Sequence, residues 1–161
     1  MVKRGPFINV WGNPKIADDV RVGAYTEIGD DVEIESGVII GAYVFIPPKV
    51  RIRARAWIGP RVTFLNDKYP PSPTLLETIV EEDVVIGAGA VILPGITLGR
   101  GCRVGAVAVV TKNVMPCATV VGNPARLLIT SSVDDALDAM LQRAKEGDAK
   151  FLEALTHNEA E

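Results

Sequence analysis

The chain has 161 residues, a length that predicts one domain with at most a small appendage. Hydrophobic residues make up 48% of the sequence and aromatic residues only 6%, which favours a narrow core of aliphatic side chains. The net charge of −3 gives no general attraction to nucleic acid or to an anionic membrane, so neither is expected as a partner. Residues 1–7 contain no long apolar run, so we expect no signal peptide, no membrane span and a cytoplasmic protein.

Aliphatic residues recur at every sixth position through most of the chain. The recurring positions are Val10, Ile16, Val22, Ile28, Ile34, Ile40, Ile46, Ile52, Ile58 and Phe64, and then Val80, Ile86, Ile92, Leu98, Val104 and Val110. A second small or branched residue follows four places after most of them, as at Val20, Val32 and Val84. A period of six matches neither a helix nor a simple alternating strand and is typical of a repeat protein.

Each repeat is predicted to form a short strand with two inward side chains, followed by a tight corner. Glycine often follows the aliphatic position, as at Gly23, Gly29, Gly41, Gly59, Gly87, Gly99 and Gly105. Gly, Asp and Asn at the corners are expected to tolerate the positive φ that a sharp turn demands. Three hexads make one triangular coil, and coils stack at the strand spacing of about 4.8 Å. About fifteen hexads therefore predict about five coils and a prism roughly 25 Å tall.

The repeat divides the chain into segments. Residues 1–9 are expected to lead in, residues 10–64 hold the first hexads, and the remaining hexads run from Val80 to about Met115. Residues 65–79 break the pattern with Pro70, Pro71 and Pro73. Since the 16 positions from Phe64 to Val80 are not a multiple of six, this segment is predicted to leave the prism as a loop. A loop that interrupts so regular a scaffold is predicted to be functional.

The end of the chain is predicted to be helical. Ser132 and Asp135 resemble a capping box, and Gly147 is expected to end the helix. The apolar face of this helix would comprise Val133, Leu137, Met140, Leu141 and Ala144. We therefore expect a solenoid domain over residues 1–128, with its loop at 65–79, and a helical tail over residues 129–161 that covers the open end of the prism.

The repeats, together with residues 86–92, 104–106, 110–114 and 122–126, resemble the hexapeptide acyltransferase family. The resemblance implies an all-β, left-handed parallel β-helix and acyl transfer from acetyl-CoA. Residues 62–70, Val-Thr-Phe-Leu-Asn-Asp-Lys-Tyr-Pro, are similar to the Phe-Thr-Asn-Asp-x-x-Pro segment of the branch that N-acetylates amino sugars carried on UDP or dTDP. Leu65 stands where that branch usually has Thr, and Pro71 where a basic residue is common. The front of the prism looks about one coil shorter than in typical members.

Family members commonly use a histidine to deprotonate a hydroxyl acceptor, whereas the one histidine here, His157, lies outside the repeats. A sugar hydroxyl needs such a base, but a neutral amine already has a free lone pair. The missing histidine therefore favours N-acetylation, and it excludes the three-histidine zinc site of the related γ-class carbonic anhydrases, so no metal is expected. The alternatives are an O-acetyltransferase that uses Asp67 or an unusual base, and a non-catalytic scaffold or binding protein.

The resemblance also implies roles for single residues. Asn66 would orient the reacting amine and Asp67 would accept a hydrogen bond from it or from a sugar hydroxyl, although either residue can simply form a turn. Lys68 and Tyr69 would hold the sugar or nucleotide. The residues expected to bind acetyl-CoA are Ala88, Gly105 and Ala106 along the pantetheine arm and Lys112 and Arg126 at the phosphates. Their alternatives are ordinary repeat corners and solvated charges.

The family further implies a homotrimer, in which the CoA groove lies between adjacent prisms, and a role in making surface polysaccharide. A basic cluster faces outward by the repeat phase and comprises Lys49, Arg51, Arg53, Arg55 and Arg61. Ordinary solvation is its leading interpretation, with a sugar-nucleotide diphosphate or acidic residues of a neighbouring subunit as alternatives. Cys102 and Cys117 form no CxxC pair, and Cys102 falls on an inward position, so a buried thiol is expected.

Overall fold

The computed structural model describes residues 3–71 and 73–128, and within these ranges the only regular elements are short strands in three sheets. The eight-stranded sheet contains β1 (Lys3–Arg4), β4 (Arg21–Val22), β7 (Ile39–Ile40), β10 (Trp57–Ile58), β13 (Val85–Ile86), β16 (Arg103–Val104), β18 (Thr119–Val121) and β19 (Arg126–Leu127). The six-stranded sheet contains β2 (Asn9–Val10), β5 (Glu27–Ile28), β8 (Phe45–Ile46), β11 (Thr63–Phe64), β14 (Val91–Ile92) and β17 (Val109–Val110). The five-stranded sheet contains β3 (Lys15–Ile16), β6 (Glu33–Ile34), β9 (Val50–Ile52), β12 (Thr78–Val80) and β15 (Thr97–Leu98).

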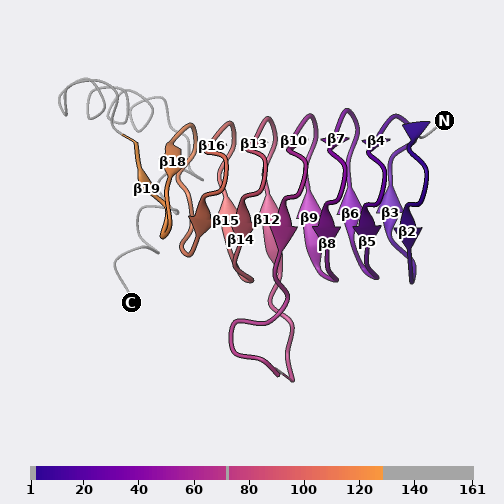
Figure 1. Ribbon diagram of the computed structural model, residues 1–161, viewed down its shortest axis with the longest axis horizontal. Helices are drawn as coiled ribbons and strands as arrows, with labels where there is room; N and C mark the ends of the chain where they lie inside the picture. The colour runs from indigo at the N-terminus through magenta and orange to yellow at the C-terminus, as the bar shows by residue number, and fades with distance from the viewer. Residues whose placement is uncertain (1–2, 72, 129–161) are drawn as a thin grey trace, which may run out of the picture.

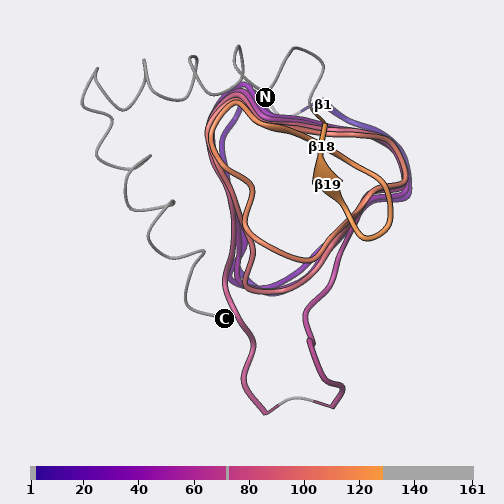
Figure 2. The same ribbon diagram turned by 90° about the vertical axis from the view of Figure 1, so that its left-hand side faces the viewer.

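The chain visits the three sheets in turn, so each coil is a triangle with one strand on each side (Figures 1 and 2). Parallel pairs mostly join residues one coil, or 18 positions, apart, as in Glu27 with Phe45. This register is three hexads long and confirms the expected all-β parallel solenoid of triangular coils, which is consistent with a left-handed β-helix. The predicted tail lies outside the described residues. Within the described ranges, no helix is long and apolar enough to cross a membrane.

We call the corner after each strand of the eight-stranded sheet the first corner (residues 5–8, 23–26, 41–44, 59–62, 87–90 and 105–108). The second corner follows the six-stranded sheet (residues 11–14, 29–32, 47–49, 65–77, 93–96 and 111–113). The third corner follows the five-stranded sheet (residues 17–20, 35–38, 53–56, 81–84, 99–102 and 115–118). Because successive coils are in register, equivalent corner residues form columns that run along the prism.

Both predicted inward positions of the repeat are buried. Ile28, Ile46 and Ile58 at the first position and Val38 at the second are completely buried, whereas Val10 and Ile16 at the N-terminal end of the prism are partly buried. Each large aliphatic side chain contributes about 1.5–3 kcal/mol on full burial. Because neighbouring coils supply the covering atoms, this stabilisation exists only in the stack.

Cys102 is one of these inward residues, and the prediction of a buried thiol is confirmed. Burial, with a further contribution from Cys117, raises the pKa of the Cys102 thiol to about 12. The thiol is therefore protonated at neutral pH and is a packing residue rather than a nucleophile.

The predicted limits of the repeats were too narrow. β1 pairs with β4 and β18 pairs with β16, so the coils begin before residue 10 and continue past Met115. The six-stranded sheet accordingly passes through six coils, where the sequence indicated about five. The first coil is hard to recognise because Arg4 occupies the repeat position that carries an aliphatic residue elsewhere.

Corner Gly and Asp residues adopt the expected positive φ, as at Gly37, Gly89 and Asp31, but the glycines that directly follow the aliphatic positions do not. Positive φ falls two residues later, at the third corner residue, where Tyr25, Lys49 and Val107 have φ of 57°, 64° and 53°. At Gly23 and Gly41 the constraint is instead the next coil, because an added Cβ would lie 2.5 Å from the nitrogens of Ala42 and Pro60. These glycines are required because the backbones of successive coils nearly touch at the first corner.

The predicted loop leaves the prism at the second corner (Figures 1 and 2). Ile52 pairs with Val80, 28 positions later, whereas Ile34 pairs with Ile52 after 18, so the loop inserts ten residues into one coil. The last coil is two residues short, because Leu98 pairs with Val114 after 16 positions. Insertion and deletion both occur at the second corner and leave the stack of strands intact.

The basic cluster is largely neutralised within the chain. Arg51 contacts Asp31 and Glu77 at 3.0 Å, and Arg53 contacts Glu35 at 2.9 Å. These partners stand in neighbouring coils or in the loop, so the pairs link one coil to the next.

Arg55 donates two hydrogen bonds of 2.7 Å to Asp83, and these bonds hold the pKa of the Asp83 carboxyl below its usual value. Of the cluster, only Arg61 makes no side-chain hydrogen bond or ion pair with the described residues.

The close approach of coils at the first corner gives a stability prediction. Gly41→Ala forces the new Cβ against the backbone of Pro60, which cannot rotate away, and we expect a loss of about 2–3 kcal/mol in the free energy of unfolding. Gly37→Asn is the matched control, because its added Cβ meets the flexible Arg55 side chain at 3.2 Å and Asn tolerates positive φ. Chemical denaturation of both variants is the measurement, and equal stabilities would contradict the role assigned to the close contact.

Candidate functional site

The loop is held to the prism through its C-terminal stem. Lys49 Nζ donates a hydrogen bond of 3.5 Å to the Leu75 carbonyl, and Arg51 forms its ion pair with Glu77. Leu76 covers Gly95, with its Cδ1 only 3.2 Å from where a Cβ would stand. These contacts come from the coil before the loop and the coil after it, so they fix the direction in which the loop leaves the second corner.

Asn66 and Asp67 follow β11 directly and are half-buried at the base of the loop. The Asp67 Oδ1 atom is buried and has no hydrogen-bond partner among the described residues. Leaving a buried carboxylate oxygen unpaired costs about 1–3 kcal/mol, and such an atom is typically kept for a ligand or water. No hydrogen bond between Asp67 Oδ1 and the described residues marks an Asx turn there.

Lys68 and Tyr69 lie further out, and both are exposed. The Lys68 ammonium is 6.0 Å from the centroid of the Tyr69 ring, at the limit of a cation–π contact. The pair thus presents a cation and a ring to solvent beside the two half-buried residues.

Ala88, Gly105 and Ala106 lie at the first corner in successive coils. The Val107 N–H donates to the Ala88 carbonyl at 2.9 Å, but among the described residues the N–H groups of Ala88 and Ala106 make no hydrogen bond. Free N–H groups on a strip of small residues can bind the carbonyl oxygens of an extended chain without side-chain obstruction. This strip, Ala88–Gly105–Ala106, is called the small-residue track below.

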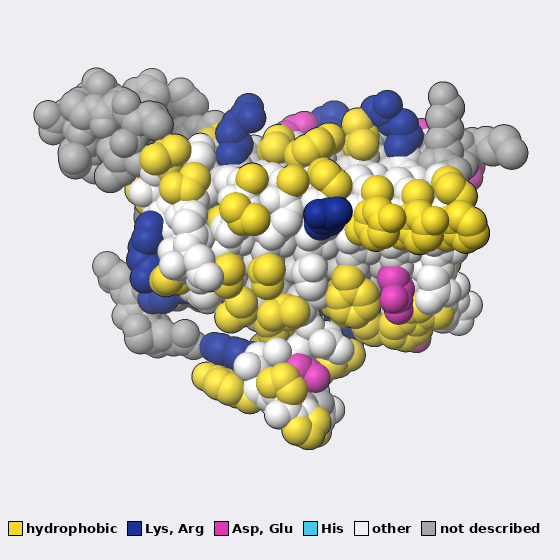
Figure 3. Space-filling model, in the orientation of Figure 1, with side chains coloured by type: hydrophobic (Ala, Val, Ile, Leu, Met, Phe, Trp, Pro, Cys, Tyr) yellow, Lys and Arg dark blue, Asp and Glu magenta, His cyan; other side chains and the backbone are white. Residues whose placement is uncertain are grey.

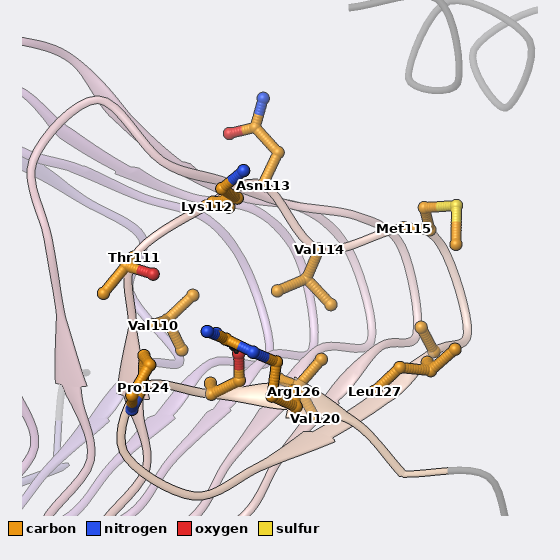
Figure 4. A pocket seen from close by; sticks show the side chains of 12 residues that line it. Val110, Thr111, Lys112, Asn113, Val114, Met115, Val120, Pro124, Arg126 and Leu127 are labelled. Carbon is orange, nitrogen blue, oxygen red and sulfur yellow. Dashed lines mark hydrogen bonds between the residues drawn. The ribbon is translucent and has the colours of Figure 1, made fainter. Parts of the chain in front are cut away.

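Lys112 and Arg126 line a cavity of about 480 Å³ at the C-terminal end of the prism (Figure 4). Its floor contains Val110, Val114 and Val120, which close the interior of the last coil. Arg126 Nη1 donates to the adjacent Ala125 carbonyl at 2.9 Å, and no Asp or Glu is among the described lining residues. The cavity therefore combines an apolar floor with two cations, which suits an anionic ligand.

The structure thus divides the predicted site residues among three places. The loop residues are at the second corner, the small-residue track is at the first corner, and Lys112 with Arg126 is at the end of the prism. Lys112 and Arg126, to which the resemblance gives a common role at the CoA phosphates, line one cavity. A side of the triangle separates the loop from the track in a single chain (Figure 2).

The sequence reasoning missed the apolar wall of the end cavity, formed by Met115 and Leu127. Leu127 reaches the cavity because β19 returns antiparallel to β18 after the turn at Gly122, which has φ of 94°. The Gly-Asn-Pro turn between two short apolar runs was a usable hairpin signal. In the described residues no group of three or more His, Cys, Asp or Glu side chains is placed to hold a metal ion.

The fold and its six-residue period define a hexapeptide-repeat protein. The family model described as bacterial transferase hexapeptide (six repeats) matches residues 13–48 and 77–112, the coils on either side of the loop. These two stretches of the chain are therefore similar to the repeats of the bacterial hexapeptide transferases.

Two curated relatives match over part of their length. A chloramphenicol acetyltransferase of Agrobacterium fabrum is 44% identical over 66 residues, which are 41% of this chain and 32% of the relative. A 2,3,4,5-tetrahydropyridine-2,6-dicarboxylate N-acetyltransferase of Staphylococcus aureus is 45% identical over 60 residues, 37% of this chain and 25% of the relative. The chain thus matches a third or less of the length of these relatives.

Among solved structures, the acetyltransferase domain of PglB from Neisseria gonorrhoeae superposes with a TM-score of 0.71 at 25% identity. The match covers 80% of this chain and 58% of that domain. A second structure of the same domain, in complex with acetyl coenzyme A, superposes with a TM-score of 0.70 over 79% of this chain and 57% of that one.

Proposed function

We propose that this protein is a cytoplasmic, acetyl-CoA-dependent N-acetyltransferase that acts on the amine of an amino sugar carried on UDP or dTDP, in the synthesis of surface polysaccharide. The observation that carries the proposal is the inserted loop, which brings Asn66 and the unpaired Asp67 Oδ1 to the edge of a hexapeptide prism. The similarity to an acetyltransferase domain that has been solved with acetyl coenzyme A supports the choice of donor. The proposal does not require a histidine, and the repeats contain none.

The proposed chemistry is direct attack by a neutral amine. The amine nitrogen forms a bond to the acetyl carbonyl carbon, the carbon–sulfur bond breaks, and CoA leaves as a thiolate. The proton lost by the nitrogen ends on the CoA sulfur, directly or through Asp67. Asn66 would hold the amine by a hydrogen bond, and Asp67 Oδ1 would accept a second one, which fixes the lone pair toward the thioester.

The donor would lie along the first corner. Its pantetheine amides would meet the free N–H groups of the small-residue track, and its phosphates would reach Lys112 and Arg126. Residues Ala88 and Ala106 stand one coil apart, so the arm would run parallel to the prism axis. Its thioester end would then point toward the coil from which the loop emerges.

The site is incomplete in one chain, because the loop and the track are on different corners. A homotrimer with its threefold axis parallel to the prisms completes the site, since rotation places the loop of one copy beside the track of the next at unchanged height. The outer face between these corners supports this arrangement. From β8 to β17 its outward side chains are Phe45, Thr63, Val91 and Val109, all uncharged and half-buried in the single chain.

An acceptor panel tests the reaction. The purified protein is incubated with acetyl-CoA and either UDP- or dTDP-amino sugars or the matching hydroxyl sugars, and the release of CoA thiol is followed. We expect turnover with amines only. Turnover confined to hydroxyl acceptors would establish O-transfer instead, and a protein that fails to bind acetyl-CoA in calorimetry would be a scaffold.

Asn66→Ala is the sharpest test of the loop. Loss of its hydrogen bond at the reacting centre should lower kcat/KM roughly ten- to a thousandfold, or about 1.4–4 kcal/mol of transition-state stabilisation. Stability should change by less than about 0.5 kcal/mol, since the loop is outside the core. His157→Ala is the control and should be silent. A fully active Asn66→Ala, or an inactive but folded His157→Ala, would refute this site.

Mixed oligomers test whether neighbours share the site. Asn66→Ala removes a loop function, and Ala106→Trp obstructs the track with an exposed side chain. If each site takes its loop from one copy and its track from the next, random assembly of a 1:1 mixture gives about half of the sites an intact loop and, independently, about half an intact track. About a quarter of the sites then have both, so about a quarter of the wild-type activity should return. If loop and track of the same chain act together, the mixture stays as inactive as its parents.

Arg126→Ala tests the donor end. Because the Arg126 side chain hydrogen-bonds, among residues 3–71 and 73–128, only to the neighbouring Ala125 carbonyl, its removal should leave the fold intact. We expect the KM for acetyl-CoA to rise about tenfold, the effect of one charge-assisted contact to phosphate, with kcat nearly unchanged. Arg103→Ala, on the outer face of β16, is the control. An unchanged KM, or a loss confined to kcat, would show that Arg126 does not bind the donor.

A further inference from the structure

Three aromatic side chains form a column at the first corner. Phe7, Tyr25 and Tyr43 occupy the same corner position in successive coils, with ring centroids 5.0 Å and 4.9 Å apart and planes inclined by 18° and 9°. They are exposed to 73%, 49% and 55%, so they do not belong to the core. Figure 3 shows a row of hydrophobic side chains along the prism toward its N-terminal end. An exposed apolar column of this size indicates a surface that contacts a ligand or another protein.

The column stops at Tyr43. The equivalent position of the next coil holds Arg61, which is exposed and is the one member of the basic cluster without a side-chain partner in the described chain. Tyr43 is half exposed, and among the described residues only the Tyr25 ring stacks on it. A half-exposed ring and a guanidinium without a partner among the described residues thus occupy equivalent positions in successive coils.

The following coils of the same corner carry the small-residue track. Along the prism the corner thus presents the stacked rings, then Arg61, then Ala88 and Ala106. The loop begins at Leu65, four residues after Arg61 and in the same coil. In a threefold assembly the neighbour's loop therefore starts at the height of Arg61, between the rings and the track.

Resting on the proposed function, we propose that Tyr43 and Arg61 bind the nucleoside diphosphate part of the acceptor. The base stacks on the face of Tyr43 that is turned away from Tyr25. The Arg61 guanidinium binds the diphosphate through paired hydrogen bonds. The sugar then extends from Arg61 toward the track and meets the neighbour's Asn66 and Asp67 loop at the end of the pantetheine arm.

Charge favours this occupant over a second copy of the chain. A protein neighbour would have to place a carboxylate opposite Arg61, whereas a diphosphate supplies the negative charge and its base supplies the flat ring in one molecule. The other arginines of the cluster already have carboxylate partners in their own chain. Arg61 is exposed and has no carboxylate partner among the described residues, so its guanidinium is available to bind an anionic ligand.

Equilibrium dialysis of the full chain with UDP and with dTDP, without acetyl-CoA, tests the subsite. We expect at least one of them to bind, Arg61→Gln to weaken binding about tenfold or more, and Tyr43→Leu to weaken it roughly tenfold. Tyr43→Phe keeps the ring and should stay within about twofold of the wild type. Arg21→Gln, an exposed arginine on the outer face of β4, and Phe7→Leu, at the far end of the ring column, should bind normally.

The subsite is refuted if neither nucleotide binds, or if Arg61→Gln and Tyr43→Leu bind as well as the controls. It is also refuted if Tyr43→Leu and Phe7→Leu both dissociate the oligomer in light scattering, because the ladder is then a contact between copies. The acceptor panel separates this outcome from the proposed function. If the protein acetylates an amino sugar but binds neither nucleotide, the proposed transfer reaction is supported and the subsite is refuted. If it binds a nucleotide through Arg61 but acetylates no amine, the subsite is supported and the proposed reaction is refuted.

Discussion

The close approach of successive coils at the first corner is the constraint on which this structure depends. At Gly23, Gly41 and Gly87 there is no room for a Cβ, because the backbone of the next coil lies about where it would stand. This contact holds the coils at strand spacing, and the spacing in turn aligns the inward aliphatic residues into one buried column. Every corner residue then has an equivalent in the coils before and after it, so functional residues at one corner form a column along the prism.

The three corners use this alignment differently. The third corner joins coils through polar contacts, such as the two hydrogen bonds from Arg55 to Asp83 and the bond from Ser36 to Asp19. The second corner absorbs the changes in length, ten residues inserted in one coil and two removed from the last. The first corner keeps a constant length and carries the ring column, Arg61 and the small-residue track. Regular geometry thus allows one edge to change while the others keep their positions.

This division has a consequence for the proposed chemistry. The loop can present Asn66 and Asp67 without disturbing the track, because the two are on different corners of a rigid prism. In the proposed homotrimer they would meet across a boundary between copies, where symmetry would fix their relative height. An amine acceptor suits such a site, because its lone pair needs orientation by hydrogen bonds rather than a dedicated base.

The sequence by itself determined the features that follow from local period. The six-residue repeat predicted which side chains point inward, including Cys102, and the broken count between Phe64 and Val80 predicted that the loop leaves the prism. Only the tertiary structure decided what depends on the next coil. It showed that Gly41 is needed for close approach rather than for its φ, that Arg51 and Arg53 are paired while Arg61 is not, and that Lys112 and Arg126 share one cavity. The partners in these contacts are about one coil apart in the chain or are brought together by the antiparallel pairing of β18 and β19. The local sequence pattern does not predict which residues of different coils come into contact.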